Sequence, residues 1–590
     1  MSAGGTTPPV VAARATASGR PWVWRQVDEN RALALAQRYG LPEILGRLLV
    51  ARGVDGDGVE RHLEPRLRDW LPDPSHLLDL DRAVVRLAEA IEGREPVAMI
   101  TDYDVDGATS AALMVSVLEE LGVAVEVLVP DRLQHGYGPH PELFDRLAGA
   151  GFRLVLVLDA GATAFAALEH ARARGLEVIV VDHHSCDDRL PPAFAFINPN
   201  RPGQESPVRH LAAVGITFLL LVGLLRYLRG RGRDPLPDLF AQLDLVALGT
   251  VCDVVPLEGL NRAFVRQGLR IAERGQRTGL SALARAARMN RIDDTWHLAF
   301  ALGPRLNAAG RLGRSDLAVA LLCERDPARA AALAAELDRL NRERQEREQQ
   351  VLAEAERQVE PQLREGVPLL FACGAGWHPG VVGIVAGRLV ERYGLPAIVL
   401  GLEQGSAKGS ARSLPGLDIG RVILAARARR LAREGGGHPL AAGVTVDSSH
   451  LEAFRRFLLD EAKMAQERSG GWSVPLVLDG GLSPGGIDPA LAALIARLGP
   501  FGAGNPEPRF AVLDAMPLQA RVVGRDHVAC LLAGPDGRRV RGIAFRAAGT
   551  PLGRRLLTGS TRLWFAGRLQ HEEWQGEMRA SLRIEDVATP

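Results

Sequence analysis

The sequence predicts an α/β protein of several domains, built around a parallel sheet and ending in a small β-barrel. The chain has 590 residues, and at roughly 150 residues per domain it should hold three or four domains. From residue 96 onward, short apolar and β-branched runs alternate with helix-like stretches, which is typical of a parallel sheet covered on both faces. Near the C-terminus, five short runs separated by Gly, Asp and Pro turns are typical of a barrel.

The composition indicates a globular protein without an evident membrane segment. The chain is 47% hydrophobic and 24% charged, which favours packed cores over global disorder. The net charge of +1 neither favours nor excludes a nucleic-acid partner. The five cysteines form no C-x-x-C pair, so a zinc knuckle is not expected and a reducing compartment, the cytoplasm, is.

The first 95 residues carry no recognisable chemistry. Residues 1–21 lack the apolar core of a signal peptide and are predicted to be a disordered leader. Residues 22–95 are predicted to be a helical packing layer. The most apolar run of the whole chain, residues 211–225, is shorter than the roughly 20 residues that a membrane span needs. We therefore expect a buried helix there, and no membrane partner.

Residues 96–325 are predicted to form the parallel-sheet domain. Strands are expected at 97–100, 123–129, 153–158 and 176–181, and helices at 108–121, 141–150 and 164–174. The apolar stretch 245–252 is expected to be a further strand. In such sheets ligands collect beyond the carboxyl ends of the strands.

Acidic and imidazole side chains follow these predicted strands. Taken singly, each has an ordinary explanation: a solvated acidic turn, a helix cap or a surface histidine. Several successive strands with such endings point instead to a shared cation, and carboxylates with one imidazole suit Mg²⁺ or Mn²⁺. The candidate residues are Asp102, Asp104, Asp106, Asp159, Asp182, His183, His184, Asp244 and Asp253.

The motifs resemble those of the DHH phosphoesterase superfamily, and among them the RecJ single-strand-specific exonucleases. DYDVDG (102–107), LDAG (158–161), DHH (182–184) and ALGTVCDVVPL (247–257) are similar to four DHH motifs. LGPRLNAAGRL (302–312), GWHPGVVGIVAGRL (376–389), KGSARS (408–413), GGHPLAAG (436–443) and FGAGNPEP (501–508) are similar to RecJ segments. Ala160 departs from the family, whose members often have Asn there.

The resemblance implies a role for each candidate residue. Asp104, Asp106, Asp159, His183 and Asp253 match metal ligands, with Asp159 bridging two Mn²⁺ or Mg²⁺ ions. Asp102 would complete the first ion's shell, Asp182 would orient the imidazoles, and His184 would contact the scissile phosphate. The catalytic set is then Asp104, Asp106, Asp159, His183 and His184. Asp244 is the alternative to Asp253 on its segment, and otherwise a supporting or capping residue.

The second half of the chain is predicted to bind the substrate. Residues 326–362 are predicted to form one long exposed linker helix, with a coiled coil as the alternative. Residues 363–468 read as a smaller α/β domain, which the resemblance identifies as a DHHA1 domain. A glycine-rich loop before a helix can bind phosphate. The DNA-binding residues that the resemblance implies are Arg132, His135, Tyr137, Arg305, Asn307, Arg311, His378, Lys408, Arg412, Ser413 and His438.

Residues 469–590 hold the predicted barrel, which the resemblance identifies as an oligonucleotide-binding (OB) fold. Such barrels bind single strands by aromatic stacking and cationic grooves. Trp564, Phe565 and Trp574 are candidates for stacking, but alternating aromatic residues in strands are equally typical of a core, and we expect core for at least one of them.

The resemblance implies a metal-dependent exonuclease that degrades single-stranded DNA 5′-to-3′ to mononucleotides through two-metal activation of water. A cleft between lobes would exclude duplex DNA. Single-strand-binding protein and a helicase are the implied partners, and a monomer is expected. Two alternatives remain open at this point. One is a phosphodiesterase acting on short oligoribonucleotides, cyclic dinucleotides or pyrophosphate, and the other is a non-catalytic DNA-binding scaffold.

Overall fold

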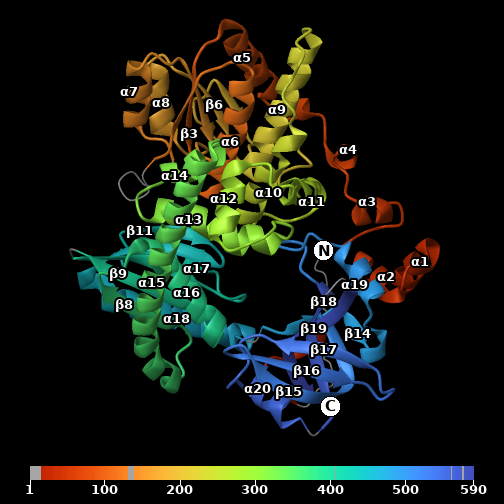
Figure 1. Ribbon diagram of the computed structural model, residues 1–590. Coiled ribbons are helices and arrows are strands. Elements are labelled where there is room, and N and C mark those ends of the chain that lie inside the picture. Colours follow the sequence, from red (N-terminus) through yellow and green to blue (C-terminus); the bar gives the residue numbers. More distant parts are fainter. Residues whose placement is uncertain (1–14, 131–137, 404, 473, 560, 575–576) are drawn as a thin grey trace. The chain divides into compact units, whose positions relative to one another are not determined.

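The computed structural model describes residues 15–130, 138–403, 405–472, 474–559, 561–574 and 577–590. The chain divides into two compact units (Figure 1). Unit 1 comprises Met1–Trp24 and Arg342–Val477, and unit 2 comprises Arg25–Asn341 and Leu478–Pro590. Unit 2 therefore contains both the parallel sheet and the C-terminal barrel.

The parallel sheet of unit 2 has five strands, and it confirms the four strands predicted from residues 97–181. The order is β4 (Val125–Leu128), β3 (Val97–Thr101), β5 (Leu154–Leu158), β6 (Glu177–Val181) and β7 (Ala195–Ile197). Every neighbouring pair is parallel. The three-residue strand β7 was not predicted, because so short a run carries little periodicity.

Alternate residues of these strands pack on opposite faces of the sheet, as a pleated strand requires. Met99 and Leu156 join a large core with α5 (Leu80–Gly93), α6 (Val105–Glu120) and α9 (Ala213–Gly230). Ile100 and Val157 join a second core with α7 (Pro141–Gly149) and α8 (Phe165–Ala173). Figure 1 shows α7 and α8 together beside β6, apart from α9. The helices therefore cover both faces and leave the carboxyl ends of the strands for the site.

The predicted strand at 245–252 is wrong, because this stretch lies within a helix, α10 (Leu243–Cys252). An apolar run that is buried all round has no amphipathic period, so helix and strand cannot be distinguished by pattern alone. The helix packs closely against α6 through Gly249, where an added Cβ would lie 2.3 Å from the Thr109 hydroxyl and 3.0 Å from Asp106 Oδ1. The chain thus reaches the acidic cluster from a helix C-terminus instead of a strand end.

Helix α9 is the buried helix predicted around residues 211–225. It is long and apolar enough to cross a membrane by length and composition, but 72% of its 18-residue window is buried inside the protein. It packs against α5, α6 and α10. A helix that is apolar all round is expected in such a position within a protein core.

The N-terminal predictions are corrected in part. Residues 1–14 lie outside the described residues, but Ala15–Thr16 form a short strand (β1), and Arg20 donates to the carbonyls of Val474 and Pro475. Trp22–Trp24 form strand β2, paired with β13 (Leu476–Leu478), where a helical layer was predicted. The rest of this layer is helical as predicted, with α1 (Glu29–Tyr39), α2 (Glu43–Val50), α3 (Val59–Leu63), α4 (Leu67–Trp70) and α5.

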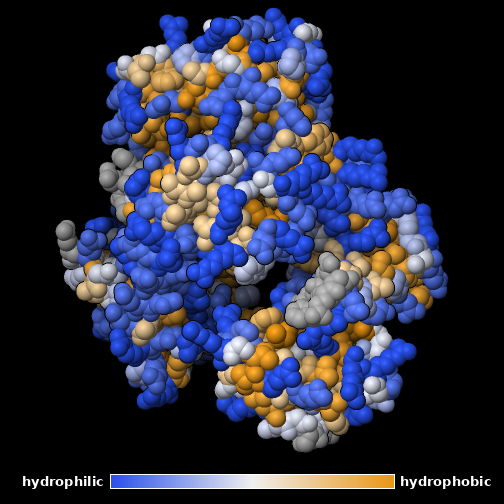
Figure 2. All heavy atoms as spheres, viewed as in Figure 1, coloured by the Kyte–Doolittle hydropathy of each residue, from blue (hydrophilic) through white to orange (hydrophobic). Residues whose placement is uncertain are grey.

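Further helices of unit 2 lead from the sheet to the long helix. They are α11 (Gly259–Glu273), α12 (Thr278–Ala286), the π-helix His297–Leu302, α13 (Gly303–Arg311) and α14 (Asp316–Cys323). The long helix α15 (Pro327–Glu365) begins in unit 2 and ends in unit 1, close to the predicted 326–362. Figure 2 shows a largely hydrophilic surface over α15. The helix is not exposed all round as predicted, because one face is buried and includes Val351, Ala355 and Val359.

Unit 1 is built on a five-stranded sheet that mixes parallel and antiparallel pairs. Its order is β11 (Glu434–His438), β12 (Ala441–Asp447), β10 (Ser406–Arg412), β9 (Ala397–Glu403) and β8 (Leu370–Ala375). Only β8 and β9 are parallel. Helices α16 (Pro379–Tyr393), α17 (Ile419–Ala428) and α18 (Leu451–Ser469) pack against it. This agrees with the smaller α/β domain expected from residue 363.

The C-terminal part of unit 2 is a closed barrel of five strands, which confirms the predicted OB fold. The strands are β15 (Phe510–Val523), β16 (His527–Ala533), β17 (Arg539–Ala544), β18 (Leu563–Trp574) and β19 (Glu577–Thr589), with α20 (Pro551–Thr558) between β17 and β18. The ring closes because β18 pairs with both β15 and β19, and β17 pairs with β19. A short strand β14 (Gly480–Leu482) and α19 (Pro489–Ala496) precede it.

Candidate metal centre and nucleic-acid-binding surface

The loop after β3 supplies three carboxylates. Asp104 caps helix α6, and its Oδ1 accepts from the N–H groups of Asp106 and Gly107. A Cβ at Gly107 would lie 2.5 Å from the carbonyl oxygen of Asp102, so this motif position requires glycine. Asp106 is buried, and its two oxygens accept from the N–H groups of Ala213 and Val214 at the start of α9, at 2.6 and 3.0 Å.

The next two strands place their ends beside this loop. The N–H of Asp159 donates to Val181 O, so Asp159 extends the ladder of the sheet by one residue. Asp159 is buried and has a φ of +58°, a conformation that a non-glycine residue adopts at some cost and that is common at functional sites. In this backbone conformation, the Asp159 carboxylate lies next to His183, with Oδ1 3.4 Å from Nε2.

Asp182 organises the two histidines. Its Oδ1 accepts from the backbone N–H groups of His183 and His184 and from His184 Nδ1, and its Oδ2 accepts from Ala162 N–H. Burial raises the pKa of Asp182, but these hydrogen bonds and the charge of His184 outweigh it, so the net shift is downward. Asp182 is therefore an ionised, fully engaged carboxylate that orients its neighbours.

His183 lies at the centre of the cluster. Its Nε2 lies 3.4 Å from Asp159 Oδ1, 3.6 Å from Asp253 Oδ2 and 4.0 Å from Asp106 Oδ2. Burial lowers the pKa of His183 to about 4, so at neutral pH the imidazole is uncharged and these contacts are not ion pairs. An uncharged imidazole keeps a lone pair for a metal ion.

Burial and mutual repulsion raise the pKa of the clustered carboxylic acids when no cation is present. For Asp106 and Asp159, burial is the larger cause and the neighbouring carboxylates add to it. For Asp253 the same causes raise the pKa to about 7. An arrangement of this kind is stable with all groups ionised only when a cation lies among them.

The donor set fits divalent metal ions. Three groups of side chains bring their ligand atoms within 4.8 Å of one another: Asp102 with Asp104 and Asp159; Asp106 with His183 and Asp253; and Asp159 with His183 and His184. The shared members are Asp159 and His183, as two adjacent ions would require. His183 Nε2 and Asp253 Oδ2 are also buried without a hydrogen-bond partner among the described residues, and an unsatisfied buried polar atom needs such an explanation.

Asp244 lies apart from these groups. It is buried near the start of α10 and forms a bidentate pair with Arg277, at 2.7 and 3.0 Å. Asp253, at the C-terminal end of the same helix, is the residue that contacts His183. The structure therefore places Asp253, and not Asp244, beside the other candidate ligands.

Sequence reasoning missed the residues that support the DHH loop. Asn198 donates to His184 O at 2.9 Å, and Asn200 donates to His183 O at 2.7 Å. Both follow β7, and the pattern Asn-Pro-Asn after a short apolar run could have indicated a structured turn. The N–H donors of Ala213 and Val214 carry no side-chain signal, so only the fold could reveal them.

Three of the predicted DNA-binding residues, Arg132, His135 and Tyr137, lie outside the described residues. Three others lie on α13, which ends beside the acidic loop, since a Cβ at Gly310 would lie 3.0 Å from Tyr103 O. Arg305 there pairs with Asp338 at 2.9 Å, whereas Asn307 and Arg311 are half-buried.

The remaining predicted binding residues lie in unit 1. Lys408 and Arg412 lie on one face of β10, where Gly383 of α16 leaves room for the Arg412 guanidinium. Lys408 and His438 are exposed, whereas Arg412 is half-buried and donates to Ser410 and to Ala411 O. Ser413 differs, because it is buried and its hydroxyl donates to Leu417 O at 2.8 Å.

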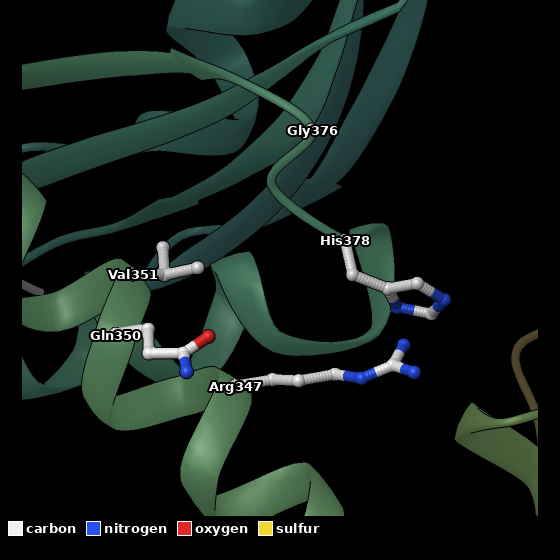
Figure 3. A pocket seen from close by; sticks show the side chains of 5 residues that line it. All are labelled: Arg347, Gln350, Val351, Gly376 and His378. Carbon is white, nitrogen blue, oxygen red and sulfur yellow. The ribbon is translucent and has the colours of Figure 1, made fainter.

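A shallow pocket of about 200 Å³ lies beside this sheet, between α15 and the loop after β8. Figure 3 shows the ends of the Arg347 and His378 side chains next to one another. His378 caps α16, with its Nδ1 accepting from Gly380 N–H at 3.0 Å. The pocket is therefore lined both by a predicted residue, His378, and by Arg347 of α15, which also pairs with Glu343 at 2.7 Å.

In the barrel, the aromatic candidates divide as the strand alternation requires. Phe565 is fully buried and belongs to the core. Trp564 is partly exposed, and its Nε1 donates to Asp514 at 3.2 Å. The side chain of Trp574 lies outside the described ones.

Comparison with known proteins identifies three domains in the chain and the family to which it belongs. The DHH family N-terminal domain matches residues 96–250, the DHHA1 domain 366–464 and the RecJ OB domain 478–586. The single-stranded-DNA-specific exonuclease RecJ of Escherichia coli is 37% identical over 88% of this chain and 91% of its own length. The chain belongs to the RecJ family. The RecJ of Bacillus subtilis is 33% identical over 97% of this chain and 71% of its own length.

Solved structures of the family agree with the fold. RecJ from Thermus thermophilus in complex with Mn²⁺ matches with a TM-score of 0.79 at 30% identity, covering 96% of this chain and 79% of that one. A RecJ bound to manganese matches with a TM-score of 0.57 at 34% identity, covering 67% of this chain and 96% of that one. Both relatives were solved with a metal of the kind that the acidic cluster fits.

Proposed function

We propose that this RecJ-family chain is a single-strand-specific DNA exonuclease that hydrolyses phosphodiester bonds 5′-to-3′ with two Mn²⁺ or Mg²⁺ ions. The observation that carries the proposal is the convergence of Asp106, Asp159, His183 and Asp253 within one cluster. Relatives named single-stranded-DNA-specific exonuclease, matched along most of their length, support it. The matched RecJ OB domain weighs against a small-molecule phosphodiesterase, and the intact acidic cluster weighs against a scaffold.

Each residue of the cluster has a task in this proposal. Asp102, Asp104 and Asp159 would hold one ion, and Asp106, His183 and Asp253 would hold the other, with Asp159 between them. Bound divalent ions lower the pKa of water and offset the charge of the phosphate and of the leaving oxygen. Asp182 keeps the His184 ring in one orientation through the 2.7 Å hydrogen bond to Nδ1, which leaves the opposite ring edge available to a phosphate oxygen.

Unit 1 and the barrel would hold the strand. Exposed Lys408 and His438, with Arg412 beside them, offer positive charge and hydrogen-bond donors to a phosphate backbone. The barrel would bind bases further along the strand, as OB folds do. The proposal also includes a role in DNA repair and recombination, with single-strand-binding protein and a helicase as partners. It further includes a monomer in the cytoplasm. The five free cysteines are in keeping with such a reducing compartment.

The test is digestion of a 5′-labelled single-stranded oligonucleotide with Mn²⁺, with Mg²⁺ and with a chelator. We expect labelled mononucleotide as the earliest product, no reaction with the chelator, and little reaction with the matched duplex. A 3′-labelled substrate distinguishes the polarity, because its label should remain in long fragments at early times. Activity that persists with the chelator, or a preference for short oligoribonucleotides, would contradict the proposal.

A further inference from the structure

The segment that carries Asp253 leaves helix α10 in an unusual conformation. Val254 has a φ of +60° and a side chain that is 70% exposed, and β-branched residues rarely adopt this conformation. Only residues 254–258 separate Asp253 from Gly259, where α11 begins. The Asp253 carboxylate has no hydrogen bond to Oδ2 among the described residues. The position of that carboxylate therefore depends strongly on the backbone of this short segment.

A turn nearly 250 residues further along the chain contacts this segment, within the same unit. Gly502 and Asn505 exchange two backbone hydrogen bonds, of 3.0 and 3.2 Å. The carbonyl at the tip, that of Ala503, accepts from Leu257 N–H at 2.7 Å. Gly504 has a φ of +70°, and a Cβ there would lie 2.8 Å from Pro256 Cβ. The turn thus meets the Asp253 segment by both a hydrogen bond and close packing.

The turn is itself held by buried polar groups. Asn505 is 3% exposed, and its amide donates to the carbonyls of Leu498 and Pro500, both at 2.9 Å. Its Oδ1 accepts from Arg52 Nε at 2.8 Å. Arg262, also buried, donates to Leu498 O at 3.0 Å. Buried hydrogen bonds of this kind are costly to break, so they fix the conformation of the turn.

We infer that the turn Gly502–Asn505 is a positioning element of the metal centre, which holds the Asp253 segment in place and thereby raises the affinity for the ion that Asp253 would bind. The inference rests on the proposed function, since it concerns the same centre. It assigns a role to the FGAGNPEP motif, which lies between α19 and the barrel. The chain that leads into the barrel would thus help to complete a metal centre built mainly from the parallel sheet.

The test compares two glycine-to-alanine variants with matched backbone strain. Gly504→Ala places a methyl group against Pro256, whereas Gly537, in the β16–β17 turn, has a φ of +77° and nothing within 4 Å of an added Cβ. In both variants, an alanine in the left-handed region lowers the stability of the fold, but only Gly504→Ala is expected to displace the Asp253 segment. The measurement is Mn²⁺ binding by calorimetry. We expect Gly504→Ala to raise the Kd about 10-fold and Gly537→Ala to leave it unchanged.

Activity gives a second readout. Because the inference gives the turn a role in ion binding alone, cleavage by Gly504→Ala should return close to the wild-type rate at saturating Mn²⁺. If Gly504→Ala does not fold, Gly502→Ala replaces it, since its Cβ would lie 2.7 Å from Leu257 Cδ1. Because this clash is milder, we expect a smaller rise in the Kd for Mn²⁺, but one that still exceeds the change in Gly537→Ala.

Equal Mn²⁺ affinity in the turn variant and in Gly537→Ala would overturn the inference and leave the proposed function standing. A wild-type protein that binds no Mn²⁺ would overturn both.

Discussion

The two sheets of this protein present their candidate functional side chains in opposite ways. In the parallel sheet of unit 2, every strand ends at the same edge, so residues from β3, β5 and β6 converge on one point, and α10 adds Asp253. In the mixed sheet of unit 1, β10 runs antiparallel to both neighbours, and its polar residues follow one another along a face. The first arrangement concentrates charge, and the second distributes it.

The difference shows how much each residue should matter. In the cluster, the buried carboxylates depend on a shared cation, so losing one changes the balance of all of them. On the face of β10, Lys408 is exposed to solvent, where salt screens its charge. We therefore expect large, all-or-none effects from the parallel sheet and graded, salt-dependent effects from the mixed sheet.

The largest effect is expected for Asp159→Asn. The amide removes the charge between the two proposed ions at nearly constant shape, and exonuclease activity should fall about 1,000-fold or more. Without metal the variant should be at least as heat-stable as the wild type at pH 8, since a buried carboxylate is gone. Asp57→Asn, at a side chain that is 95% exposed, is the control. Substantial activity in Asp159→Asn would contradict the proposal that Asp159 lies between the two ions.

A pH dependence of stability is the second prediction. In the metal-free fold, the pKa of Asp253 is raised from 3.8 to about 7 by burial first and by Asp104 next. A raised pKa stabilises the fold below pH 4, and this contribution, on the order of a few kcal/mol, is lost as the pH rises through 7.

Mg²⁺ should replace the proton as the stabilising partner of the cluster. The increase in Tm on adding Mg²⁺ should therefore be larger at pH 8 than at pH 5.5. Asp253→Asn should flatten this difference. An increase that is the same at both pH values would show that the carboxylates are not repelling one another in the metal-free protein.

A smaller effect is expected for Asp182→Asn. Asp182 accepts the His184 Nδ1 hydrogen bond and two backbone N–H groups of the DHH loop, and losing such a supporting carboxylate typically costs 10–100-fold. We expect kcat to fall by about that factor, with the Kd for Mn²⁺ raised less than in Asp159→Asn. Asp244→Asn disrupts a buried pair with Arg277 away from the cluster, so it should lower the Tm without a specific loss of Mn²⁺ affinity.

The smallest effects are expected in unit 1. Arg412→Ala should raise the KM for single-stranded DNA about 10-fold with little change in kcat, because phosphate contacts contribute to binding and not to bond cleavage. Lys408→Ala should raise KM less, and the difference from the wild type should fade with added salt. Ser413→Ala serves as the comparison, since its hydroxyl donates within the fold to Leu417 O. A kcat effect in Arg412→Ala would place it in the catalytic step.

The sequence by itself determined most of the elements of this protein and the candidate residues of its metal centre. Strand periods, the long helix and the five barrel strands were predictable because pattern and turn residues report local structure directly. The gathering of the carboxylates and histidines was predictable for a different reason: they follow parallel strands, and parallel strands end at one edge of a sheet. The apolar stretch at 245–252 was not, because a fully buried run has no distinguishing period.

Only the tertiary structure decided how these groups are held. It placed Asp253 beside His183 at the C-terminal end of α10, and it paired Asp244 with Arg277 instead. It also supplied the N–H donors of Ala213 and Val214, the side chains of Asn198 and Asn200, and the turn Gly502–Asn505. Backbone donors and contacts between distant segments leave no periodic trace in a sequence, since they exist only after the chain has folded.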